Sequence, residues 1–166
     1  MRTAKLSVVV LALLALSAVA AQAQTNNASI TASAVVQTPI NVTAGNNLDF
    51  GNVFPGVAKI VAVGDAGAGT WSVVGQASAN VNLTFNLPAT LSDGANTLPI
   101  ASYTAHHNPV NAPAGGTNFT PSAVATSTAL SAGGLLFVFI GATVTPATNQ
   151  AAGTYTGSLT MTVVYF

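Results

Sequence analysis

The sequence predicts an all-β protein: a single β-sandwich of short antiparallel strands that follows a cleaved signal peptide. Beyond the first residues, apolar side chains recur with a period of two, and no stretch has the 3.6-residue period of an amphipathic helix. Gly, Pro and Asn interrupt these runs at short intervals, as they do at the turns of sandwiches.

Residues 1–23 have the features of a secretory signal peptide. Arg2 and Lys5 precede an apolar run that is short for a membrane span, and Ala21-Gln22-Ala23 fits a small-x-small cleavage site. We therefore expect one domain over residues 24–166, with no membrane insertion after cleavage. The expected location is the periplasm, the cell surface or the extracellular space.

The composition limits the kinds of partner. Beyond residue 23 the charged residues are Lys59, Asp49, Asp65 and Asp93, and the whole chain is 4% charged, against about 25% in a typical domain. No basic patch exists, so we expect no nucleic-acid binding. There is no cysteine, hence no disulfide. A surface with so little charge favours packing against copies of itself.

The predicted elements follow the alternating runs in order. We expect strands over residues 28–37, 40–44, 48–54, 58–63, 70–75, 80–87, 96–105, 133–144 and 154–166. Pro99 predicts that the run 96–105 is an edge strand or two short pieces. The Pro-, Gly- and Asn-rich residues 106–122 predict a long loop. The apolar, β-branched run 133–144 predicts a strand that is buried on both faces.

No arrangement of titratable residues predicts an enzyme. Acid–base catalysis needs a pair of positioned groups, whereas Asp49, Asp65 and Asp93 lie in turn-like contexts. A Ca²⁺ site at Asp65 would need six or more oxygens, which no Asp cluster supplies. His106 and His107 are adjacent and would point to opposite faces of a strand, so we expect a surface pair. We expect no catalytic residue, metal or cofactor.

Two uncharged, alternating segments are distinctive, because an uncharged edge strand invites pairing with another strand. The terminal strand, residues 154–166, could pair either with the chain's own first strand or with a strand of another molecule. The first segment has on one side Ala28, Ile30, Ala32, Ala34 and Val36. The terminal one has on one side Tyr155, Leu159, Met161, Val163 and Tyr165.

The segments "ASITASAVVQTPINVTA", "LDFGNVFPG" and "NQAAGTYTGSLTMTVVYF" resemble the domain-of-unknown-function 4402 family, DUF4402, of exported bacterial β-proteins. That family is in turn similar to spore coat protein U and archaic chaperone–usher pilin domains. The resemblance implies an incomplete immunoglobulin-like sandwich, which the N-terminal segment of the next subunit completes. It also implies that a periplasmic chaperone grips the terminal strand at Leu159, Met161, Val163 and Tyr165. Unlike many spore-coat relatives, this chain has no disulfide, and Phe166 follows the aromatic Tyr165.

These observations lead to two functional hypotheses. The first is a non-enzymatic subunit of a surface fibre, pilus or coat, assembled by strand complementation through self-association or a chaperone- or usher-like partner. In it, Ala28, Ile30, Ala32, Ala34 and Val36 are the donor side chains. The alternative is a self-contained secreted module, with residues 28–37 as its own first strand, that binds carbohydrate or another surface component. Its expected contacts are Trp71, Tyr103 and Phe119.

Overall fold

The structure, a computed structural model, describes residues 25–166; the predicted signal peptide lies outside them. In the described residues every regular element is a strand, and none forms a helix that could cross a membrane. The strands are β1 (Asn41–Ala44), β2 (Lys59–Val61), β3 (Gly69–Val74), β4 (Asn80–Asn86), β5 (Thr90–Asp93), β6 (Asn96–Asn108), β7 (Thr117–Phe119), β8 (Thr126–Ala129), β9 (Leu135–Val144) and β10 (Thr160–Tyr165).

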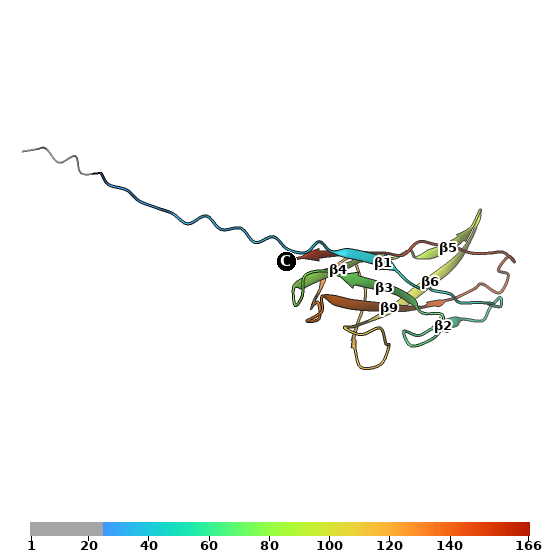
Figure 1. Cartoon of the computed structure of the whole chain (residues 1–166). Helices are drawn as coiled ribbons and strands as arrows, with labels where there is room; N and C mark the ends of the chain where they lie inside the picture. Colours follow the sequence, from blue (N-terminus) through green and yellow to red (C-terminus); the bar gives the residue numbers. More distant parts are fainter. Residues whose placement is uncertain (1–24) are drawn as a thin grey trace, which may run out of the picture. The chain divides into compact units, whose positions relative to one another are not determined.

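The strands form two antiparallel sheets in a sandwich-like arrangement, as the sequence predicts. The larger sheet has the order β1-β3-β9-β6-β5, with β2 also paired to β9 and β7 to β6. The smaller sheet has the order β10-β4-β8. Figure 1 shows β1, β3, β9 and β6 of the larger sheet, with β4 of the smaller one beside them. The compact unit that carries all of these strands spans Val36–Phe166.

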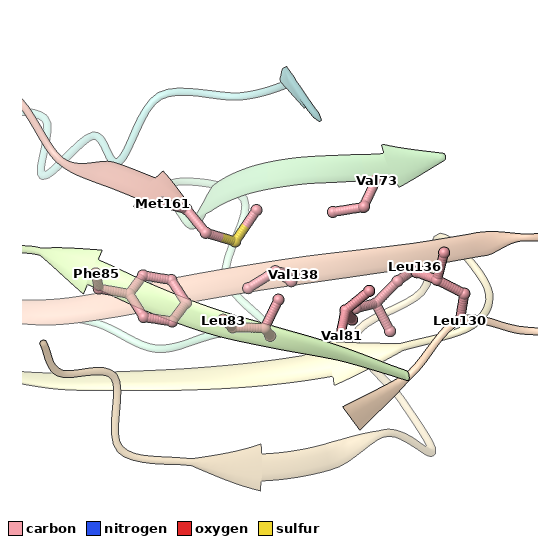
Figure 2. Close-up of a cluster of buried hydrophobic side chains, with 8 residues drawn as sticks. All are labelled: Val73, Val81, Leu83, Phe85, Leu130, Leu136, Val138 and Met161. Atoms are coloured by element: carbon pink, nitrogen blue, oxygen red, sulfur yellow. The ribbon is translucent and has the colours of Figure 1, made fainter. Parts of the chain in front are cut away.

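The main core lies between the two sheets. In Figure 2, side chains of β3 and β9 meet those of β4 and β10. Leu83 and Val138 are fully buried there, and Trp71 packs edge-on against Phe85 with ring centroids 6.2 Å apart. The cluster consists of Val73, Val81, Leu83, Phe85, Leu130, Leu136, Val138 and Met161. The alternation that predicted β4 is therefore the alternation of its core face, which is buried at every second residue.

A second core cluster lies under β5, β6 and β9. Its buried members are Leu91, Leu98, Ile100, Ala142 and Val144. Partly buried side chains from the loop after β1 and from the segment before β10 pack against it, among them Leu48, Phe50, Val53 and Tyr155. Because irregular segments rather than strands cover this cluster, it is the less enclosed of the two.

Two predicted strands are wrong. Residues 28–37 belong to no strand and are exposed throughout, and within residues 25–166 no strand pairs with their backbone. Residues 48–54 form a loop instead: the Asp49 carboxylate accepts a hydrogen bond from the Gly51 N–H (2.7 Å), and Gly51 has a φ of 58°. This Asx-type turn breaks the extended run.

The predictions for Pro99 and for residues 106–122 are also wrong. β6 is one long strand between β5 and β9, although a bulge lies between Ala101 and Thr104. Pro99 is tolerated because its ring nitrogen faces the point where β9 ends; its carbonyl still accepts from the Thr145 N–H. Beyond it, His106 and His107 continue β6, and β7 pairs back with them, so that the loop spans only residues 109–116.

Candidate strand-pairing groove

β10 leaves one backbone edge of the smaller sheet unpaired. Among the described strands it pairs only with β4, and the Phe166 N–H donates to the Asn80 carbonyl at the end of that ladder. In an antiparallel ladder alternate residues bond to the neighbour. The even-numbered residues therefore bond to β4, while Met161, Val163 and Tyr165 direct their N–H and C=O groups away from it. The same three residues turn their side chains inward, where Met161 is buried and the other two are half-buried.

β1 leaves a similar edge on the larger sheet. Of the strands in residues 25–166, it pairs with β3 alone, and the Gly45 N–H donates to the Thr70 carbonyl (2.8 Å). By the same alternation, Val42 and Ala44 direct their backbone groups outward. The Val42 side chain packs against the main core. Both sheets thus have an unpaired edge strand with an apolar inner face.

The hydroxyl of Tyr165 connects the chain before β1 to the end of β10. It donates to the Thr38 carbonyl (2.7 Å) and accepts from the Gln76 N–H (2.6 Å). Thr38 is held a second time, because its N–H and hydroxyl both donate to the Gln76 side-chain carbonyl, at 3.2 and 3.1 Å. The open edges of β1 and β10 therefore belong to the same side of the sandwich.

A groove of about 730 Å³ continues this side of the sandwich beyond β10. One of its walls is formed by Asn46–Val53, the other by Gly153–Leu159, and the second core cluster contributes Leu91, Leu98 and Ile100 to its floor. The Gly153–Leu159 wall is attached to β5 by one bridge, in which Ser92 and Thr156 exchange backbone hydrogen bonds of 2.8 and 2.9 Å. The groove is thus a partly open extension of the core.

The structure divides the predicted terminal residues between two environments. Met161, Val163 and Tyr165 lie in β10, as predicted. Tyr155 and Leu159 precede the strand and line the groove instead. The Tyr155 hydroxyl donates to the Ala151 carbonyl (2.8 Å) and accepts from the Gln150 amide (2.7 Å). The regular strand is therefore shorter than residues 154–166, because only its second half has β4 beside it.

The predicted donor residues are all exposed. Ala28, Ile30, Ala32, Ala34 and Val36 have no strand partner, and Ile30 and Val36 are 96% and 95% exposed. Apolar β-branched side chains with this exposure are unusual in a finished fold, where they are normally buried. Residues 28–37 are thus part of no strand that the structure describes.

Three aromatic residues that could contact a ligand have packing roles. Trp71 and Phe119 both contact Phe85 of the main core, with ring centroids 6.2 and 5.7 Å from it. The Tyr103 hydroxyl donates to the Pro88 carbonyl (2.7 Å), and burial raises the pKa of this phenol to about 12. All three are half-buried rather than displayed together on a surface.

The histidine pair is not a surface pair, which corrects the expectation. His106 is 4% exposed; its Nδ1 lies 3.1 Å from the Asn118 side-chain oxygen, and its Nε2 has no hydrogen-bond partner. His107 points to the other side of β6 and packs against Phe119, as adjacent strand residues must. Burial, and secondarily the charge of His106, lowers the pKa of His107. No cluster of potential metal ligands occurs in residues 25–166.

The aspartates make turn contacts of the predicted kind. The Asp65 side chain accepts from the Ala62 N–H (2.8 Å), and its backbone carbonyl accepts from the Ala68 N–H (3.0 Å). Asp93 ends β5 at the hairpin to β6, where Gly94 has a φ of 58°. The Asp49 carboxylate accepts from the Gly51 N–H, as described above. All three aspartates thus lie in turns or loops.

Sequence reasoning missed the β1 edge, the groove and the role of Gln76. Each depends on residues that are distant in the chain, so no local pattern reveals them. One residue in the sequence is related to this contact: Gly75 precedes Gln76, and a Cβ on Gly75 would collide with the Tyr165 hydroxyl.

Comparison with known proteins identifies the family to which the strands belong. A family model described as "Domain of unknown function (DUF4402)" matches residues 40–165, a range that includes every strand from β1 to β10. No curated protein matches the chain.

Proposed function

This chain belongs to the DUF4402 family. Because both of its sheets have an unpaired edge strand, we propose that it is a non-enzymatic structural subunit that assembles by strand complementation. The groove would accept an extended strand from residues 25–36 of a second copy. The assembled form would be a fibre, pilus or coat at the cell surface.

The observation that carries this proposal is the pair of unpaired edges on one side of the sandwich. β10 directs the backbone groups of Met161, Val163 and Tyr165 outward, and β1 directs those of Val42 and Ala44 outward. Neither strand contains a charge or a proline, the features by which proteins usually protect an edge. An added strand would satisfy these groups and cover the inner apolar face.

The exposed N-terminal residues have the properties of such a strand. The 12 residues from Thr25 to Val36 carry no charge and no Pro or Gly, and they would extend over about 40 Å at the rise of a β-strand. The groove wall Gly153–Leu159 and β10 together contain 13 residues, so the two lengths match. Alternation would place Ile30 and Val36 on the same face of the inserted strand.

The alanines limit how much energy side chains contribute. Complete burial of Ile30 or Val36 is worth roughly 1.5–3 kcal/mol each, whereas Ala28, Ala32 and Ala34 add little area. Backbone hydrogen bonds along the two edges, at roughly 0.5–1.5 kcal/mol each, would supply much of the remainder. We therefore expect an assembly whose stability depends on strand register more than on any one side chain.

The likeness to spore coat protein U and archaic pilin domains adds a partner. Before assembly, the open β10 edge would need protection, and a periplasmic chaperone that lends a strand could provide it. Export through the predicted signal peptide, residues 1–23, is part of this proposal. The alternative, a self-contained module that binds carbohydrate, stays a prediction; the packing roles of Trp71, Tyr103 and Phe119 do not favour it.

The proposal is tested on protein recovered from its native host and run on an SDS gel without heating, beside a boiled sample. We expect a ladder of multiples that boiling reduces to a monomer band. Deletion of residues 25–37 should abolish the ladder, since it removes the donor and leaves the strands intact.

A matched pair of substitutions tests the predicted face. Ile30→Asp should eliminate the ladder, because it would bury an unpaired carboxylate in the groove. Val35→Asp adds the same charge to a side chain that is also exposed (89%) but lies on the opposite face of an extended strand, so the ladder should remain. A single monomer band in every unheated lane would exclude assembly by strand exchange.

A further inference from the structure

We propose that Tyr165, Gln76 and Pro39 form a latch that prevents residues 25–37 from folding back into the chain's own groove and so directs them to a second copy. This inference rests on the proposed function. The proposed function states which segment the groove accepts. The latch explains why residues 25–37 of the same chain do not occupy it.

A latch is needed because a tethered segment has a large advantage over a free one. Residues 25–37 are joined to β1 through Thr38, Pro39 and Ile40, and a short flexible tether gives an effective concentration of about 1 mM. A second copy at micromolar concentration could not compete with self-insertion unless self-insertion were disfavoured. A fibre subunit therefore requires a feature that prevents the chain from closing on itself.

The contacts at Thr38 provide the first half of that feature. Its carbonyl accepts from the Tyr165 hydroxyl (2.7 Å), and its N–H and hydroxyl both donate to the Gln76 side chain. The Gln76 N–H in turn donates to Tyr165 (2.6 Å), which closes the network. Every backbone polar group of Thr38 is thus used, and none is left to form the closing pair of a hairpin.

Pro39 provides the second half. To lie in its own groove beside β1, the segment would have to reverse direction between Gln37 and Ile40. The tight turns that join antiparallel strands need positive φ at one or both central residues. Pro39 is fixed near −65°, and Thr38 is β-branched and precedes a proline, which holds it in an extended conformation. The sequence Thr38-Pro39 therefore opposes a tight hairpin between residues 25–37 and β1.

The surroundings of Tyr165 fit this role. Its ring is half-buried against the main core, and Gly75 leaves the space that its hydroxyl occupies. Tyr165 is also one of the three β10 residues whose backbone faces an incoming strand. Tyr165 therefore contacts Thr38, where the chain's own donor segment joins the sandwich, and also forms part of the edge that would receive the donor segment of a second copy.

The test compares the mature chain with Thr38→Asn/Pro39→Gly, which replaces the opposed pair by the Asn-Gly sequence favoured in hairpins. Mass is measured by light scattering over a protein dilution series. We expect the substituted chain to stay monomeric at concentrations roughly a hundredfold above those at which the unchanged protein assembles. Its thermal midpoint should be higher than that of a chain lacking residues 25–37 and independent of concentration, because it completes its own groove.

Tyr165→Phe is the second variant, and it keeps the ring and the packing. Loss of the two hydroxyl bonds should raise the concentration needed for assembly by about tenfold. Tyr103→Phe is the control: it removes a phenol hydroxyl that donates to the Pro88 carbonyl, neither lines the groove nor contacts Thr38, and should leave assembly unchanged.

The outcomes separate the two proposals. If the unchanged protein assembles and both latch variants assemble at the same concentration, the latch is excluded and strand exchange stands. If the unchanged protein is monomeric while its dilution series and melting match those of the self-completing variant, both proposals are excluded.

Discussion

The carbonyl oxygen of Val61 in β2 occupies the position that a Cβ on Gly141 of β9 would need. The atoms that a side chain would meet belong to the backbone of residues 61–63, and the first of these, Val61, pairs with Ala142 of β9. A glycine in the middle of the most buried strand therefore has a specific cause: the close approach of a neighbouring chain.

Gly141→Ala should accordingly destabilise the sandwich by about 1–3 kcal/mol, the usual cost of overpacking. Urea unfolding of the two proteins measures the difference. Gly64→Ala is the matched control, since nothing lies within 4 Å of its Cβ position and its φ is not positive. Replacement of Gly64 should leave stability unchanged or raise it slightly, because alanine restricts the unfolded chain. An equal loss of stability in both variants would show that the contact with Val61 is not responsible.

Asn108 should stabilise the loop between β6 and β7. It is 3% exposed, and its amide donates to the carbonyls of Ala112 (2.8 Å) and Ala114 (2.9 Å) while its oxygen accepts from the Val110 N–H (3.1 Å). Asn108→Ala should cost about 2–3 kcal/mol, at about 1 kcal/mol per bond, and expose residues 109–116 to proteolysis.

The control for this loop is Asn111→Ala, a change of the same type at an exposed position in the same loop. We expect its unfolding curve and its proteolysis rate to match those of the unchanged protein. Rapid cleavage of both variants would indicate that the loop opens regardless of Asn108.

Stability should decrease under mildly acidic conditions because of His107. Burial, with a smaller contribution from the charge of His106, lowers its pKa in the folded protein below the ordinary value of 6.5. The unfolded chain therefore binds the proton first, so the stability present above pH 6.5 is lost as the pH falls from there towards the folded-state pKa.

The measurement is the free energy of unfolding at about pH 7.5 and about pH 5.5, on either side of the ordinary histidine pKa. His107→Gln should reduce the difference between the two values, because it removes the buried imidazole. An unchanged difference would assign the pH dependence to other groups.

The fold was predictable wherever burial alternates along one strand. Val81, Leu83 and Phe85 alternate with polar residues in the sequence and alternate in burial in the structure, so β4 was identified correctly. β6 was not, since Pro99 usually marks an edge; here the strand tolerates it because β9 ends opposite. Such a compensation depends on Thr145, which lies 46 residues further along the chain, and leaves no local trace.

The candidate site was predictable only in part, for a related reason. The apolar face of Met161, Val163 and Tyr165 is visible in the sequence, and so is the uncharged segment around Ile30. Whether an alternating segment becomes a strand depends on a pairing partner, which explains why residues 28–37 were assigned incorrectly. The Tyr165–Gln76–Thr38 network joins three distant parts of the chain and could not be inferred from spacing.

The alternation of β10 also makes the groove accessible to spectroscopy. Thr162 points to solvent, bonds its backbone to β4 and lies between Met161 and Val163, whose side chains pack in the main core and whose backbone groups face the open edge. Because the chain has no cysteine, Thr162→Cys would introduce a unique thiol for a fluorophore or spin label. Such a label would sense an arriving strand from the outer face, without occupying the space that the strand must enter.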